Sequence, residues 1–298
     1  MRSIANERDH PATWEVARPS LPIRLPGIDM AGFRVPHAPA DGLRMIPHPA
    51  VTLIIEFGAG AYILDDGSGH RHQGSAVAGP GLGLGGTVRA WGTDVACVQV
   101  RLSPVVAGAV LGVSPAELNS ATVLSVDDLW GREAARASEQ LGESMSWADR
   151  FALTDALLAR QWSARTRVDP EVAWAWHRIT VSRGLVRVED LASELGWSRK
   201  RLWARFNAQI GMPPKRAAKL VRFDNAAHRL VAGESAALVA ADGGYFDQSH
   251  LYRDVMTFTG ATPATVADEP FLTVDDVAWP STARRPHSPG RTRPVSYA

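Results

Sequence analysis

The sequence predicts an α+β fold in two domains. The N-terminal domain is a β-rich barrel or sandwich with trailing helices, and the C-terminal domain is all-α, with two helix-turn-helix units joined by a long helix. Three observations support this: apolar runs between turn residues at 51–102, helical periodicity after residue 104, and a helix-turn-helix pattern that occurs twice within 170–267. A chain of 298 residues is long enough for two domains that each bury a core.

The predicted strands lie in the first third of the chain. Residues 1–50 are rich in proline and glycine, so irregular chain with short strands is expected there. Apolar runs bounded by turn residues then predict strands at 51–57, 61–64 and 95–100. The Asp-Asp-Gly-Ser-Gly cluster at 65–69 predicts a hairpin turn. Several short strands at this spacing are typical of a small barrel or sandwich.

Helices are expected after Pro104. The periodicity predicts helices at 104–112, 115–119 and 131–162. Apolar side chains recur on the faces of the last of these, at Leu141, Met145, Leu153, Leu157 and Leu158.

The domain boundaries follow from composition. The segment 163–170 is polar and ends in proline, which makes it the predicted linker. We therefore expect an N-terminal domain at 1–165, β-rich to about residue 102 and then helical, and a second domain at 166–268. Residues 269–298 contain several prolines and are expected to form a partly disordered tail.

The second domain contains a helix-turn-helix unit near its start. Leu191, Ala192 and Leu195 share one face of a short helix, which ends at Gly196 because glycine readily adopts a positive φ. Ser198 then caps a helix from Arg199 to about Gln209. At about 100° per residue, that helix has an apolar stripe and an opposite face of cations and small residues. The stripe is Leu202, Phe206 and Ile210, and the opposite face is Lys200, Arg201, Ala204 and Ala208, flanked by Asn207. Such a face fits a major groove, although an ordinary amphipathic surface helix looks similar.

The same pattern recurs about 50 residues later. Residues 236–245 predict a small-residue helix that ends in glycine, and Asp247 caps a helix from Gln248 to Thr259. The predicted buried face is Leu251, Val255 and Phe258, while Ser249, His250, Arg253 and Thr257 point away.

A long helix is expected to join the two units. It begins at Pro213-Pro214, since proline pre-sets φ for a first helical turn, and runs to about Val231. Nineteen residues at about 1.5 Å each span roughly 28 Å. Successive major-groove faces lie about 34 Å apart, so one chain could reach two of them.

Basic residues concentrate on this region although the formal net charge is only +1. Between Arg199 and Arg222 there are eight basic residues and no acidic ones, and a second basic stretch lies at 284–293. A run of charge is usually a solvated face, but this one coincides with the first helix-turn-helix unit and the connecting helix.

Many positions of the second domain match one family pattern. In the first unit and the connecting helix they are Leu191, Ala192, Gly196, Trp197, Ser198, Arg199, Leu202, Arg205, Phe206, Gly211, Pro213, Arg222 and Ala226. In the second unit they are Val239, Ala240, Gly244, Tyr245, Asp247, Gln248, Ser249, His250, Leu251, Arg253, Gly260, Thr262 and Pro263. Over these 80 or so residues the chain resembles the AraC/XylS family of bacterial transcription regulators.

The resemblance implies two recognition helices, here 199–209 and 248–258, in successive major grooves of double-stranded DNA. It also implies an N-terminal domain, often a cupin-like barrel, that binds a small-molecule effector or forms a homodimer, and RNA polymerase as a partner if the protein is an activator. Ala204 stands where the family often has a polar base reader, which shifts the expected contacts in the first helix to its neighbours. The expected DNA-binding residues are Arg199, Lys200, Arg201, Ala204, Arg205, Asn207, Lys215, Gln248, Ser249, His250, Arg253 and Thr257.

Other patterns in the N-terminal domain have simpler explanations. The glycine pattern at 81–86 formally matches a dinucleotide-binding motif, but Pro80 precedes it and a β-like stretch follows, so a glycine-rich turn is expected. His70 and His72 could share a strand face as in metal-binding cupins, yet no third ligand follows closely, and neither a metal nor a cofactor is expected. Trp91 and Trp130 are expected in the core, with an effector pocket as the alternative.

Composition narrows the class of protein further. Cys97 is the only cysteine, which rules out an intrachain disulfide and a thiolate zinc site and argues against a fused alkylation-repair enzyme. A non-enzymatic regulator is therefore expected. No run of 18 apolar residues exists and the N-terminus lacks a secretory apolar core, so a cytoplasmic protein with no membrane span is expected. The alternative, which Ala204 and the modest net charge leave open, is a sensor or partner-binding protein with a degenerate DNA-binding face.

Overall fold

The computed structural model describes residues 2–3, 14–38, 41–65, 69–82, 88–113, 117–118, 123–163 and 168–279. Four predicted features lie partly outside these residues: the turn at 65–69, the glycine pattern at 81–86, the helix at 115–119 and the linker at 163–170. The last residues of the predicted tail, 280–298, lie outside them entirely.

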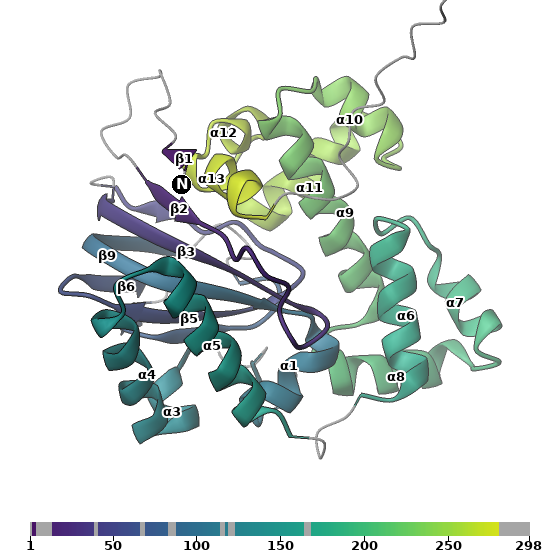
Figure 1. Ribbon diagram of the computed structural model, residues 1–298. Coiled ribbons are helices and arrows are strands. Elements are labelled where there is room, and N and C mark those ends of the chain that lie inside the picture. The colour runs from purple at the N-terminus through teal and green to yellow at the C-terminus, as the bar shows by residue number, and fades with distance from the viewer. Residues whose placement is uncertain are drawn as a thin grey trace, which may run out of the picture.

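The N-terminal domain is built on one antiparallel sheet (Figure 1). Its main path runs β1-β2-β3-β9-β5-β8-β10, with β4, β6 and β7 paired beside it. The strands are β1 (Arg2–Ser3), β2 (Glu15–Ala17), β3 (Ile28–His37), β4 (Leu43–Arg44), β5 (Val51–Phe57), β6 (Ala61–Asp65), β7 (Arg71–Gln73), β8 (Ala76–Ala78), β9 (Arg89–Leu102) and β10 (Leu124–Ser125). The three predicted strands and the β6–β7 hairpin are confirmed. The expectation of only short strands before residue 50 was wrong, because β3 is ten residues long.

The long strand β9 organises this sheet. One of its edges pairs with β3 and, at its N-terminal end, with β4. Its other edge pairs first with β6 and then with β5. Asp94 lies where the partner changes from β6 to β5, and its φ of 51° bends the strand there.

Helices pack against one face of the sheet (Figure 1). The helices of this domain are α1 (Pro104–Leu111), α3 (Val126–Trp130), α4 (Arg132–Glu143) and α5 (Trp147–Gln161). Val98 and Val100 of β9 pack with Leu141 of α4 and Phe151 of α5 in a single apolar core.

The prediction of one continuous helix over 131–162 was wrong, because the chain breaks between α4 and α5. Ser146 caps α5 by accepting a hydrogen bond from the Asp149 backbone N–H at 3.1 Å. This local hydrogen bond competes with the continuation of α4. Met145, which was expected on an apolar helix face, lies in the break and is 94% exposed.

The C-terminal domain is all-α as predicted. Its helices are α6 (Pro170–Val181), α7 (Val188–Glu194), α8 (Arg199–Ile210), α9 (Pro214–Val231), α10 (Ala236–Asp242), α11 (Gln248–Thr259), α12 (Pro263–Ala267) and α13 (Pro270–Ala278). Helix α13 lies in the segment that was assigned to a tail. Its prolines suggested irregular chain, but Pro270 stands in the first helical turn, where proline is favoured.

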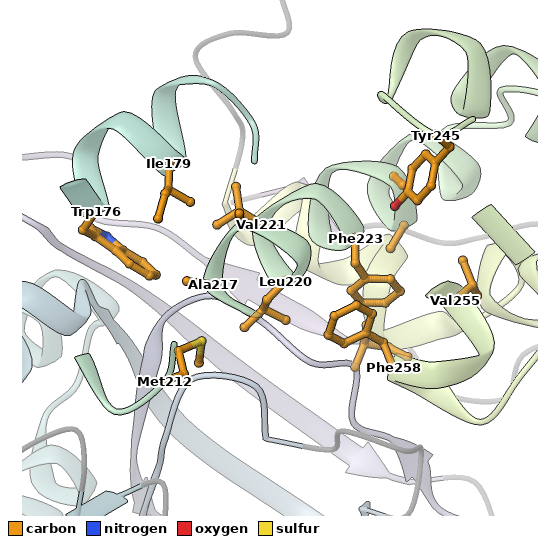
Figure 2. Close-up of a cluster of buried hydrophobic side chains, with 14 of the residues drawn as sticks. Trp176, Ile179, Met212, Ala217, Leu220, Val221, Phe223, Tyr245, Val255 and Phe258 are labelled. Carbon is orange, nitrogen blue, oxygen red and sulfur yellow. The ribbon is translucent and has the colours of Figure 1, made fainter. Parts of the chain in front are cut away.

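The long helix α9 is the centre of this domain. Figure 2 shows that its side chains reach neighbours on both sides, with Ala217 and Val221 toward Trp176 and Ile179 and Phe223 stacked on Phe258 of α11. The rings of Phe223 and Phe258 lie 4.7 Å apart. Both helix-turn-helix units therefore share one continuous core, which fixes each of them relative to α9.

The two domains are packed against each other. Ile46, from the chain between β4 and β5, is buried in the core of the C-terminal domain, and Val105 of α1 packs against the same core. No helix among the residues described here is long and apolar enough to cross a membrane.

Candidate nucleic-acid interface

Each helix-turn-helix unit turns at a glycine with positive φ. The first unit consists of α7 and α8, and Gly196 between them has a φ of 63°. The second consists of α10 and α11, and the corresponding Gly244 has a φ of 69°. A residue with a Cβ is strained in this conformation, which explains why glycine ends both short helices. Phe246, one residue before the cap of α11, is almost fully exposed.

Side-chain caps start both recognition helices. Ser198 Oγ accepts from the Arg201 backbone N–H at 3.2 Å, and Asp247 Oδ1 accepts from the His250 backbone N–H at 2.7 Å. Neither helix carries an acidic residue in its first turn. The N-terminal turn of α8, which has a neutral cap, therefore keeps the positive end of its helix dipole, which favours phosphate, whereas the Asp247 carboxylate offsets the dipole of α11.

The predicted buried stripes are confirmed in both helices. Leu202, Phe206 and Ile210 of α8 are fully buried, as are Leu251 and Val255 of α11, and Phe258 is nearly so. Each helix consequently presents a fixed opposite face to solvent.

The exposed face of α8 carries Lys200, Ala204 and Ala208, as predicted. Lys200 forms no ion pair, hydrogen bond or ring contact with any residue that the structure describes. Arg201 is also exposed, but its guanidinium lies 4.4 Å from the ring centre of Trp197. Asn207 is half-buried at the edge of the face.

Two other predicted DNA-binding cations of α8 have acidic partners within the chain. Arg199 lies 3.5 Å from Glu189 of α7. Arg205 Nε donates to Asp169 at 2.9 Å, just before α6, and the hydrogen bonds from Gln209 and Arg205 lower the pKa of the Asp169 carboxyl. These contacts hold the two arginines toward the neighbouring helices and away from the centre of the exposed face.

The exposed face of α11 is more polar. Gln248, Ser249, Arg253 and Thr257 are all exposed. Arg253 Nε donates to the Ser249 carbonyl at 3.3 Å, and Thr257 Oγ1 donates to the Arg253 carbonyl at 2.7 Å.

His250, also predicted to contact DNA, is half-buried on this helix. Its Nδ1 accepts from the Phe246 backbone N–H at 3.3 Å, and its ring packs edge-on against Tyr245 at 5.4 Å. These contacts give His250 a role in holding the turn before α11.

The basic run continues into α9, where its members differ. Lys215 lies exposed in the first turn. Arg222 and Lys219 instead pair with Asp254 of α11, at 2.7 Å and 3.4 Å. Asp254 is buried, so these two cations hold α11 against α9.

Sequence reasoning did not include two exposed aromatic side chains. Trp203 of α8 is 52% exposed and Tyr252 of α11 is 45% exposed, and each stands five residues after its helix cap. Tyr252 lines a groove of about 640 Å³ together with Gln248, Ser249 and Arg253. Both residues directly follow a buried leucine, so the same helical projection that placed the cations would have found them.

The residues that could hold a metal do not converge. His72 Nε2 lies 3.2 Å from the Ser75 carbonyl, and His70 is exposed beside it. Within the described ranges, no group of three His, Cys, Asp or Glu side chains could hold a metal ion. Cys97 is buried, and burial raises the pKa of its thiol to about 12.

Comparison with known families matches residues 191–269 to the model of a helix-turn-helix domain. Among solved structures, the chain is similar to the C-terminal domain of AraT, a response regulator from Geobacillus stearothermophilus, at 20% identity over 34% of this chain and 86% of that one, with a TM-score of 0.33. It is also similar to ToxT from Vibrio cholerae at 11% identity, over 88% of this chain and 97% of that one, with a TM-score of 0.43. No curated protein matches the chain.

The two structural likenesses have low identity and low TM-scores, and they add nothing to the assignment. The family match spans both helix-turn-helix units and the helix between them, which are the elements that the geometry places around one core. The C-terminal part of the chain therefore carries an AraC-type helix-turn-helix domain, the DNA-binding module of transcription regulators.

Proposed function

We propose that α8 and α11 lie in successive major-groove faces of one DNA duplex and that the N-terminal domain controls their binding. One observation carries the proposal: both recognition helices are packed against a single helix, α9, and both have exposed opposite faces. The 18 residues of α9 extend about 27 Å, close to the spacing of roughly 34 Å between groove faces.

The exposed side chains suggest unequal reading by the two helices. In α8, Lys200 can donate to guanine O6 or N7 or to phosphate, and the methyl groups of Ala204 and Ala208 can contact thymine methyls. In α11, Arg253 offers a bidentate donor for guanine, and Gln248 and Ser249 offer further hydrogen bonds. More base-specific hydrogen bonding is therefore expected from α11 than from α8.

The remaining predicted residues are proposed to position the protein. Arg199, Arg201, Arg205 and Lys215 are exposed cations at the edges of α8 and the start of α9, suited to phosphate contacts. The first turn of α8 adds backbone N–H groups at the positive end of a helix dipole. Asn207, His250 and Thr257 would contribute at the margins of the two faces.

Control by a small-molecule effector or by homodimerisation is proposed for the N-terminal domain. The sheet of that domain encloses an apolar cavity lined by Phe33, Tyr62 and Trp91, among others. An effector that binds one arrangement of the two domains more tightly would shift the population toward that arrangement.

The test is selection of genomic DNA fragments by the purified full chain, followed by affinity measurements on the selected site at several salt concentrations. The expected result is one enriched sequence motif with two half-sites about one helical turn apart. The logarithm of the affinity should fall linearly with the logarithm of the salt concentration, by about 0.9 per phosphate neutralised. A chain that binds no fragment at low salt, with or without candidate effectors, would instead be a sensor or partner-binding protein.

A further inference from the structure

Helix α13 follows the matched helix-turn-helix region and returns to the N-terminal sheet (Figure 1). Two neighbouring apolar side chains of α13, Phe271 and Leu272, pack in different domains. Leu272 is buried in the core of the C-terminal domain, whereas Phe271 packs among side chains of the N-terminal sheet that include Leu43 and Met45. Val274, Val277 and Ala278 continue along that sheet beside Phe33. One short helix is thus part of both cores.

Two sets of polar contacts fasten α13 and its neighbours to the sheet. Arg44 of β4 donates from Nε to Glu269 at 2.9 Å and from Nη1 to the carbonyl of Thr259 at 3.1 Å. Thr259 is the last residue of recognition helix α11, so Arg44 connects that helix directly to the N-terminal domain.

The second set of contacts is buried. Asp275 of α13 accepts a hydrogen bond from Arg101 of β9 and lies 3.4 Å from His228 Nε2 of α9. The Arg101 guanidinium also lies 4.5 Å from the ring centre of Trp279. This set joins the sheet, α13 and the central helix of the DNA-binding domain.

Phe271 also closes the apolar cavity in the sheet. The cavity is about 50 Å³ and is lined by Trp14, Phe33, Tyr62, Trp91 and Phe271, among others. Of the described side chains that line it, Phe271 is the one that comes from the C-terminal part of the chain. Small-molecule sites are usually about 300–1,000 Å³, so the cavity is too small for an effector while the Phe271 ring is in place.

We propose that α13 is a displaceable latch: a small uncharged apolar molecule takes the place of the Phe271 ring in the cavity and detaches α13 from the sheet. Detachment removes the Arg44–Glu269 contact and the buried contacts of Asp275 with Arg101 of β9 and His228 of α9. The walls of the cavity are aromatic and aliphatic with Gln99 as a polar neighbour, and none of the described side chains that line it is charged, which sets the chemical class of the ligand. The inference rests on the proposed control of DNA binding by the N-terminal domain, and it assigns that control to one helix.

The arrangement of the domains can be measured independently of DNA. Met145 and Leu238 are exposed and lie in different domains, so nitroxide labels on Met145→Cys and Leu238→Cys report the distance between the domains by pulsed electron double resonance. The buried Cys97 remains unlabelled, which the unmodified full chain verifies. The probe is toluene, because apolar cavities made by truncation of core side chains bind small aromatic molecules.

In the doubly labelled chain with Phe271 intact, the expected result is one narrow distance between the two labels. A second population of distances should appear after Phe271→Ala or after addition of toluene. DNA affinity should rise with that population by about 5- to 150-fold, the usual range of coupling between two sites. The matched control is Phe151→Ala, which removes a buried ring from the core of the N-terminal domain away from α13 and should leave the single distance unchanged.

A folded Phe271→Ala chain with the single wild-type distance would overturn the proposal. If that variant does not fold, Glu269→Gln with toluene decides, since it removes the negative charge that pairs with Arg44 and keeps the size of the side chain. An unchanged distance in Glu269→Gln would also overturn the latch. A second distance population in a chain that binds no DNA would retain the latch and contradict the proposed function instead.

Discussion

Ser198 and Asp247 cap the two recognition helices in the same way. Each side-chain oxygen accepts a hydrogen bond from the backbone N–H three residues further along, at 3.2 Å for Ser198 and 2.7 Å for Asp247. Both residues follow a turn that contains a glycine with positive φ. The two units thus start their recognition helices by one local mechanism, although the side chains they present to solvent differ.

The first prediction concerns the charged cap. Asp247→Ala should lower the free energy of unfolding by about 1 kcal/mol, because the His250 backbone N–H loses its acceptor at the start of α11. Asp247→Asn is the matched control, since asparagine caps about as well as aspartate. Urea unfolding of the three full-length proteins measures the difference. Equal midpoints for the alanine variant and the wild type would show that the cap does not stabilise α11.

Arg253 should read a base. Arg253→Ala is expected to cost about 1–3 kcal/mol of binding to the selected site and to relax the base preference at one position. Arg216→Ala, which removes an exposed cation from the first turn of α9, is the control and should weaken binding to all sequences about equally. Fluorescence anisotropy on the selected site and on single-base variants gives both quantities. Wild-type affinity in Arg253→Ala would remove this residue from the readers.

The exposed aromatic residues give a third prediction. Trp203→Ala and Tyr252→Ala should lower the free energy of unfolding by only about 1–2 kcal/mol, because about half of each side chain is already in solvent. Each should nevertheless weaken DNA binding by roughly 1–2 kcal/mol, from the apolar area that the groove would cover. Leu202→Ala, next to Trp203, is the opposite case and should cost about 2–5 kcal/mol of stability because Leu202 is fully buried. Unchanged affinity in both aromatic variants would place the DNA on another face.

Local rules predicted the two helix-turn-helix units. Caps at Ser198 and Asp247, glycine at the turns and apolar stripes with a 3.6-residue period are all set by neighbours in the chain, so the sequence alone located them. The break around Met145 was missed because a serine cap at Ser146 competed with an unbroken apolar period.

Partners far apart in the chain could not be predicted in this way. Arg222 belongs to a basic run, but only the packed structure places it beside Asp254 on α11. The same holds for Asp275, whose partner Arg101 lies on β9. Helix α13 depends on such contacts, since a nine-residue helix with two cores to join has little stability of its own. Tertiary packing therefore decided which charged residues stay available for DNA.

The last prediction is a pH dependence at the junction of the domains. His48, in the chain between β4 and β5, is 23% exposed in its side chain, and its Nδ1 accepts from the Ala50 backbone N–H at 3.1 Å. The charged and titratable groups around it are Asp224 and His228 of α9, Arg101 of β9 and, beside His228, Asp275 of α13. Burial, and then the positive charges of Arg101 and His228, lower the pKa of His48 well below its usual 6.5.

A neutral His48 in the folded chain fixes the sign of this effect. As the pH falls through about 6.5, the imidazole takes up a proton in the unfolded chain but not in the folded one. The free energy of unfolding should therefore be steady above this pH and decrease below it. In His48→Asn the side-chain oxygen can still accept from the Ala50 backbone N–H, and the decrease between pH 6.5 and 5.5 should be smaller. Urea unfolding at pH 5.5, 6.5 and 7.5 tests this, and parallel curves for the two proteins would assign the pH dependence to other groups.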